Sequence, residues 1–169
     1  MTRTVVAFSG LASSDQRWKC SLALEVLRRF GELRLRVTGG SMLPSLWPGD
    51  VLVIRSAQAS ACSCGDLVLF RREERFFVHR VLDVSSTGVL TRGDSLPAPD
   101  PLVTTDELLG RVISVSRNGT EQPLPTPVRF GRLIAWGVCR STVFYNLLLR
   151  LRAAYQRRPW RPAPTTALF

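Results

Sequence analysis

The chain has 169 residues, of which 45% are hydrophobic and 21% charged, and this composition predicts a single globular domain with peripheral segments. Its 23 Lys and Arg against 13 Asp and Glu give a net charge of +10. That excess is typical of a protein that meets a phosphate-rich partner, although a GC-rich genome also enriches arginine. No run reaches the roughly 18 to 20 apolar residues of a membrane-spanning helix. The four cysteines lack the spacing of a disulfide framework or metal site, so we expect reduced thiols, no metal and no cofactor.

The first expected element is an amphipathic helix over residues 15–30, capped by Ser14 or Asp15 and followed by Gly31. Its apolar positions are Trp18, Leu22, Leu24, Val26 and Leu27. Charged residues interrupt this segment, so it cannot span a membrane, and the preceding residues lack the apolar region of a signal peptide. We therefore expect a protein on the cytoplasmic side, soluble or peripherally attached to a membrane, without a spanning helix.

Short β-type runs separated by turn signals occupy the middle of the chain. Leu33, Leu35 and Val37 alternate with arginines, as in a half-buried strand. Strands are predicted at 33–37, 51–54, 67–70, 76–84, 88–91 and 109–115, with a helical turn at 104–109. This spacing favours a mainly β (α+β) fold of short, mostly antiparallel strands with peripheral helices.

Four segments are expected along the chain. Residues 1–31 form an N-terminal helical segment, 32–122 a β domain, 123–158 a proline linker with a basic amphipathic helix, and 159–169 a disordered tail. In the helix expected at 128–158, arginines occupy about a third of the circumference. That pattern fits a helix lying on an anionic membrane surface, and it equally fits a helix packed on the β domain with solvated arginines.

The segment 39–50 presents Ser41 on a turn that two glycines precede and two prolines stiffen. A serine held in this way is a candidate nucleophile if a base can reach it. The single histidine of the chain, His79, lies in a predicted strand where it shares a face with Phe77 and Val81. A lone histidine among apolar neighbours is more often a structural residue than a base, and the residues alone leave both roles open. Downstream, Asp94 and Asp100 are two carboxylates that could orient the imidazole.

These motifs occur in an order that resembles type I signal peptidases, within the S24/S26 serine peptidase group that also holds the LexA-like autoproteases. The resemblance rests on Ser41-Met42-x-Pro44 with Gly49-Asp50, and on the segments 65–68, 78–81, 91–94 and 109–112. It implies a signal-peptidase/LexA-like β fold over about residues 33–115, with Ser41 as nucleophile. A histidine in place of the common lysine is similar to the archaeal and endoplasmic-reticulum branch. That branch implies His79 as the base and Asp100 as its orienter, with Asp94 the alternative.

The resemblance further implies an oxyanion site at the Ser41 backbone N–H and substrate contacts at Met42 and Pro44. Family members often carry a hydroxyl two residues before the nucleophile, where this chain has Gly39. Thr38 is the nearest replacement, and an enzyme lacking one such donor is expected to be slow.

The leading hypothesis is therefore a serine endopeptidase that acts on a peptide or preprotein, with a possible attachment to anionic membranes through 128–158. A soluble processing protease, a LexA-like regulatory or autoprocessing module, and an inactive peptide-binding member are the alternatives. Nucleic acid is an unlikely partner because 15–30 offers no second helix for a helix-turn-helix, and the charge lies mainly beyond the β domain.

Overall fold

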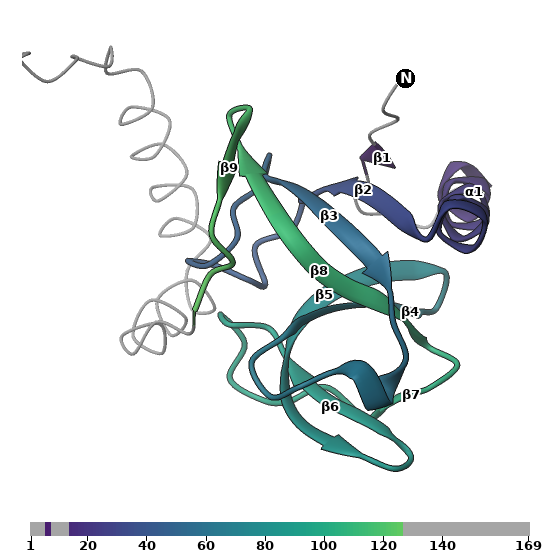
Figure 1. Cartoon of the computed structure of the whole chain (residues 1–169), viewed down its shortest axis with the longest axis vertical. Helices are drawn as coiled ribbons and strands as arrows, with labels where there is room; N and C mark the ends of the chain where they lie inside the picture. Colours follow the sequence, from purple (N-terminus) through teal and green to yellow (C-terminus); the bar gives the residue numbers. More distant parts are fainter. Residues whose placement is uncertain (1–5, 8–13, 127–169) are drawn as a thin grey trace, which may run out of the picture.

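The computed structural model describes residues 6–7 and 14–126. Its main feature is one nine-stranded sheet, in which all neighbouring strands are antiparallel except the short pair β1–β2. One helix of 17 residues, α1, lies beside β2 at one end of the sheet, and β5 to β7 curl away at the other (Figure 1). The prediction of a mainly β fold with mostly antiparallel strands and a peripheral helix is confirmed. The helix expected at 128–158 and the tail at 159–169 lie outside the described residues.

The six predicted strands are found as β2 to β6 and β8, with bounds that differ by a few residues, whereas β1, η1, β7 and β9 were not predicted. In chain order the elements are β1 (Val6–Ala7), α1 (Ser14–Phe30), β2 (Glu32–Arg36), β3 (Val51–Ser56), the 3-10 turn η1 (Ala59–Ala61), β4 (Leu67–Arg72), β5 (Arg75–Ser85), β6 (Gly88–Arg92), β7 (Val103–Thr104), β8 (Leu108–Arg117) and β9 (Thr120–Gln122). In the sheet their order is β1-β2-β3-β8-β4-β5-β6-β7, and β9 pairs with the far end of β8.

Strand β4 explains how a single sheet holds two cores. Its first four residues, Leu67 to Phe70, are all buried, because β4 lies between β8 and β5 and both of its faces are covered. Leu67 and Leu69 pack into a core beneath α1, whereas Val68 and Phe70 pack into a second core with β6 and β7. The sheet therefore curls around β4, and side chains that alternate along β4 and β5 enter different surroundings.

Two hairpin turns place the long strands. Asn118 and Gly119 both have positive φ, as the tight turn between β8 and β9 requires, and this turn signal is visible in the sequence. Glu73 and Glu74 also have positive φ, 50° and 57°, in the turn between β4 and β5, although glutamate is not a usual residue there. The expected helical turn at 104–109 is reduced to one hydrogen-bonded turn, from Glu107 N to Thr104 O, before β8 begins at Leu108.

The helix α1 buries only part of the face that was expected, at Leu27 and Val26. Among residues 18–30 of the helix, Cys20, Ala23 and Leu27 are buried; Ala23 and Leu27 pack into the first core, and the Cys20 thiol donates to Glu74 O. Trp18 and Leu22, which were expected on the apolar face, are 53% and 45% exposed. The small side chains of Cys20 and Ala23 let the helix approach the sheet closely, and this close approach turns the larger residues outward. No helix in the described part of the chain is long and apolar enough to cross a membrane.

Candidate active site

Ser41 lies in the loop between β2 and β3, and this loop is closed at its neck. Val37 donates its N–H to Asp50 O, and Gly49 donates to Val37 O, each at 2.8 Å. The buried Asp50 carboxylate accepts two hydrogen bonds from Arg117 of β8, at 2.9 and 2.7 Å, and one from the Trp47 N–H. A bidentate arginine–carboxylate pair with a further backbone donor holds the loop to the sheet.

The Ser41 backbone is held directly by the loop that follows β6. Ser95 donates its N–H to Ser41 O at 2.9 Å and its hydroxyl to Gly40 O at 3.0 Å. Gly93 lies so close that a Cβ built there would stand 2.6 Å from Ser41 O. Only glycine fits at position 93. The absence of a side chain there lets the backbone of segment 91–94 lie against the backbone of Ser41.

His79 connects the Ser41 loop to Asp100. The His79 Nε2 atom lies 3.0 Å from Ser41 Oγ, and Nδ1 lies 2.7 Å from Asp100 Oδ2. The imidazole is only 3% exposed, and the rings of Phe70 and Phe77 lie 5.7 and 6.0 Å from it, centre to centre. The three polar side chains are far apart in sequence: Ser41 comes from the β2–β3 loop, His79 from β5 and Asp100 from the loop after β6, and they meet in one hydrogen-bonded chain.

The charge of Asp100 follows from its partners. Partial burial raises the pKa of Asp100, but hydrogen bonds from His79 and from the Thr91 hydroxyl, the latter at 2.7 Å, outweigh burial and hold the pKa below its ordinary value. The carboxyl group is therefore ionised at neutral pH and can only accept hydrogen bonds. The Nδ1 atom of His79 must then carry its proton toward Asp100, which leaves Nε2 of the neutral ring free to accept the Ser41 proton.

The backbone around Asp100 is fixed on both sides. Asp100 N donates to Thr91 O at 2.8 Å, which ties the loop to the end of β6. On the other side, Arg72 donates to the carbonyl oxygens of Pro101 and Leu102 and forms an ion pair of 2.8 Å with Glu107. The hydrogen bond from Arg72 lowers the pKa of Glu107 to about 2.

Asp94, the alternative orienter, has a different partner. Arg80 binds it in bidentate fashion, through Nε at 2.9 Å and Nη2 at 2.7 Å, and the Ser45 hydroxyl also donates to it. The remaining Arg80 nitrogen, Nη1, donates to Gly65 O and Pro125 O. Within residues 14–126, Asp94 forms no hydrogen bond or ion pair with His79. The structure thus brings Ser41, His79 and Asp100 together, and it assigns Asp94 to a neighbouring ion pair.

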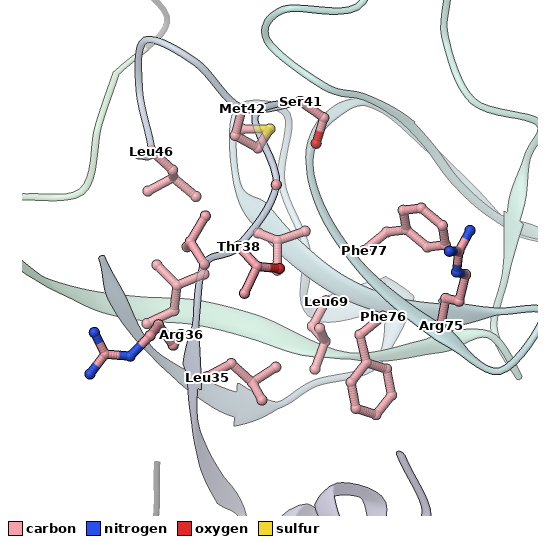
Figure 2. Close-up of a pocket in the computed structure, with 14 residues that line it drawn as sticks. Leu35, Arg36, Thr38, Ser41, Met42, Leu46, Leu69, Arg75, Phe76 and Phe77 are labelled. Atoms are coloured by element: carbon pink, nitrogen blue, oxygen red, sulfur yellow. The ribbon is translucent and has the colours of Figure 1, made fainter. Parts of the chain in front are cut away.

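A cavity of about 270 Å³ opens beside Ser41. Figure 2 shows Ser41 and Met42 at one side of it, with Leu69 and Phe76 across the space. Thr38 and Gly39 line the same cavity, and Met42 is buried in its wall. Pro44, which was expected to contact substrate, lies outside this wall and is half-buried. Among the described residues, no group of three His, Cys, Asp or Glu side chains gathers to hold a metal ion.

Several site residues were not singled out in the sequence. Thr91 and Arg72 hold Asp100, and Arg36 and Arg75 line the cavity, but none of them had an assigned role. The one available signal was the alternation of side chains along β5, which indicates that His79 and Arg80 project to opposite sides and therefore have different partners.

Neither a scan against models of known protein families nor a search of curated proteins finds a match for this chain.

Proposed function

We propose that the chain is a serine endopeptidase of the type I signal-peptidase-like group, which cleaves a peptide or preprotein through an acyl-enzyme at Ser41. The observation that carries the proposal is the continuous chain of hydrogen bonds from Ser41 Oγ through His79 to Asp100, beside a cavity. A buried imidazole with a carboxylate on one nitrogen and a serine hydroxyl on the other is the arrangement that activates serine for acyl transfer. The order of the sequence motifs supports the choice of group.

In the proposed mechanism, Ser41 Oγ attacks the carbonyl carbon of the scissile peptide bond while its proton passes to His79 Nε2. The imidazolium that forms is stabilised by the ionised Asp100, which keeps the Nδ1 proton. His79 then gives the proton from Nε2 to the leaving amine as the carbon–nitrogen bond breaks. Water attacks the ester by the same route, its proton going to His79, and the release of the acid restores Ser41.

The charge on the tetrahedral oxygen would be stabilised by the Ser41 backbone N–H, with the Thr38 hydroxyl as the nearest side-chain donor. The Ser41 carbonyl is already engaged by Ser95, so the peptide planes around Ser41 have a fixed orientation before substrate binds. Loss of a single preorganised donor typically lowers the rate about a hundred- to a thousandfold. Because Gly39 carries no hydroxyl, we expect turnover in the slow part of the range for serine peptidases.

A peptide could bind by pairing with an open strand edge next to the cavity. Strand β6 is in register with β5 only from Arg80 onward, so in the described part of the chain the β5 edge over 75–79 has β4 on one side alone. Residues 76–78 of this segment also line the cavity. Main-chain hydrogen bonds along such an edge give affinity for extended peptides, and the cavity gives selectivity for a side chain.

The proposal is tested by labelling the full chain with a fluorophosphonate probe and measuring the intact mass. We expect one probe adduct on the wild type, none on Ser41→Ala, and a strongly slowed reaction with His79→Ala. Ser86→Ala, in an exposed turn, is the matched control and should label as the wild type does. An adduct that persists in Ser41→Ala, or no adduct on the wild type, contradicts the proposal.

A second candidate is a peptide-binding module without turnover, which the missing hydroxyl at Gly39 favours. The two candidates differ in one measurement. The enzyme forms the adduct at Ser41 and releases cleaved peptide, whereas the binding module retains peptides equally in the wild type and in Ser41→Ala.

A further inference from the structure

The cavity beside Ser41 combines an apolar interior with two arginines. Leucine, valine, methionine and phenylalanine side chains make up most of its wall. Of the 14 residues that line it, only Arg36 and Arg75 are charged. Both charges are positive, so an acidic group is the side chain that this wall complements.

The two arginines belong to different strands and stand on opposite sides of the cavity. Arg36 ends β2, and Arg75 begins β5. Figure 2 shows Arg36 on one side and Arg75, beside Phe77, on the other, both away from Ser41. Each precedes a site residue by a similar number of positions, since Arg36 comes five residues before Ser41 and Arg75 four residues before His79. An extended chain advances about 3.3 Å per residue. A peptide lying between these segments would therefore meet both arginines about three to five residues from the scissile bond.

Within the described residues, five of the ten arginines at positions 32–122 form ion pairs with carboxylates, and of the five that do not, Arg36 and Arg75 are the two that line the cavity. Ion pairs join arginines 55, 72, 80, 111 and 117 to carboxylates of the same chain. Within the described residues, neither Arg36 nor Arg75 has an ion-pair or side-chain hydrogen-bond partner. Glu73 and Glu74 occupy the turn just before Arg75, yet neither forms an ion pair with it in this part of the chain. Arg36 is exposed and Arg75 half-buried, so both guanidinium groups are accessible to a bound peptide.

We infer that this cavity selects peptides that carry an aspartate or glutamate three to five residues from the scissile bond, through Arg36 and Arg75. The inference rests on the proposed function, because it assigns a substrate preference to the same site. The apolar interior takes a neighbouring uncharged side chain of the peptide, and the arginines add the charge selectivity. A basic side chain at those positions meets two like charges and is disfavoured.

The test is a cleavage profile on a proteome-derived peptide library, with cut sites read by mass spectrometry and Ser41→Ala as the background. We expect Asp and Glu to be enriched about two- to fivefold at one or more positions three to five residues from the cut, the range that a partly exposed ion pair provides. The variant Arg36→Glu/Arg75→Glu should lose this enrichment and favour Lys and Arg there. The uncharged Arg36→Gln/Arg75→Gln should lose the enrichment without the reversal. Circular dichroism of both variants verifies that they are folded, and their Ser41-dependent cleavage of other library peptides supplies the profiles that are compared.

The matched control is Arg28→Glu/Arg34→Glu, which makes the same change in net charge at positions outside the cavity wall. It should keep the wild-type profile, because net charge alone steers peptides without fixing a position. Ser41-dependent cleavage with no acidic enrichment, or with enrichment unchanged in Arg36→Glu/Arg75→Glu, overturns this inference and leaves the proposed function standing. Absence of any Ser41-dependent cleavage overturns the proposed function, and the inference with it.

Discussion

Asp94 and Asp100 lie six residues apart in the loop after β6, and each carboxylate binds a cationic or ionisable side chain of β5. Asp94 is held by Arg80 and Asp100 by His79, two residues that are adjacent in the chain. Because side chains alternate across a strand, the neighbours His79 and Arg80 project to opposite sides of β5 and receive the two carboxylates separately. One loop therefore supplies two carboxylates with the same shortest distance to β5, 2.7 Å, one in a bidentate ion pair with Arg80 and one in a single hydrogen bond with His79.

The chemical difference between the pairs lies in the partner of each carboxylate. Arginine stays protonated throughout the accessible pH range, so the Asp94–Arg80 pair holds structure and cannot exchange a proton. An imidazole can accept and release a proton at a ring nitrogen, and the Nε2 atom of His79 faces a serine hydroxyl. The comparison teaches that the partner, and not the carboxylate, decides which aspartate can take part in acid–base chemistry.

Exchanging Asp100 for Asn has the largest expected effect. The amide side chain can donate to His79 Nδ1 and so favours the wrong tautomer of the ring, with the proton on Nε2. We expect activity at Ser41 to fall by about 10³- to 10⁴-fold while the fold is retained. The rate of fluorophosphonate labelling, with circular dichroism to monitor folding, measures this loss. A variant that labels at the wild-type rate would assign the orienting role elsewhere.

Exchanging Asp94 for Asn should act on stability instead. It leaves Arg80, whose side chain is 6% exposed, without its carboxylate, and breaking one side of a buried ion pair typically costs about 3 to 5 kcal/mol. Denaturant unfolding measures the loss. The labelling rate of the protein that remains folded should change far less than in Asp100→Asn. Similar losses of activity in the two variants would remove the distinction between the pairs.

Thr91→Val sharpens the comparison from within the Asp100 pair, since it removes one hydroxyl donor with little change in volume. The Thr91 hydrogen bond helps to lower the pKa of Asp100, so its loss should raise that pKa toward the ordinary value. Activity should fall about tenfold, as for one charge-assisted hydrogen bond, and its loss on the acid side should begin at higher pH. The pH dependence of the labelling rate measures the shift. Thr91→Ser keeps the hydroxyl and should return the profile to that of the wild type. An acid limb that does not move in Thr91→Val would give Thr91 only a packing role.

The smallest effect is expected for Glu107→Gln, at the half-exposed ion pair with Arg72. The pKa of Glu107 is lowered from 4.5 to about 2 in the folded chain, because Arg72 binds the ionised form. The stabilisation is therefore complete above the unfolded pKa and is lost as pH falls toward 2. We expect Glu107→Gln to cost about 0.5 to 1 kcal/mol near neutral pH and almost nothing at pH 2. Unfolding curves at several pH values measure this, and a constant difference between the proteins would contradict the assigned pair.

Much of the fold could be predicted from the sequence because the alternation of apolar and polar residues marks the strands, and turn residues mark where they end. Leu33 and Leu35 alternate with arginines in β2, and the Asn118-Gly119 turn marks the β8–β9 hairpin. The helix face was correct at Leu27 and Val26, which pack on the first core, but wrong at Trp18 and Leu22, which outweighed Cys20 and Ala23 in the pattern. Only tertiary packing shows that the small residues touch the sheet.

For the candidate site, the sequence identified Ser41 and His79 through their rarity and setting, but only the resemblance favoured Asp100 over Asp94, and the residues alone left both open. That choice depends on which face of β5 each aspartate meets, and the distance between loops is not encoded in local spacing. Thr91 opens the segment 91–94 that the resemblance uses, but neither it nor Arg36 or Arg75 had a role assigned from the sequence. Their roles arise from contacts between strands that are distant along the chain.

The most direct test of the central claim is the rate at which a fluorophosphonate modifies Ser41, located by peptide mapping, in the wild type, Asp100→Asn and Asp94→Asn. The account predicts modification of the wild type and of folded Asp94→Asn at similar rates, and a reaction about a thousandfold slower in Asp100→Asn. Equal rates in the two aspartate variants, or modification at a residue other than Ser41, would contradict it.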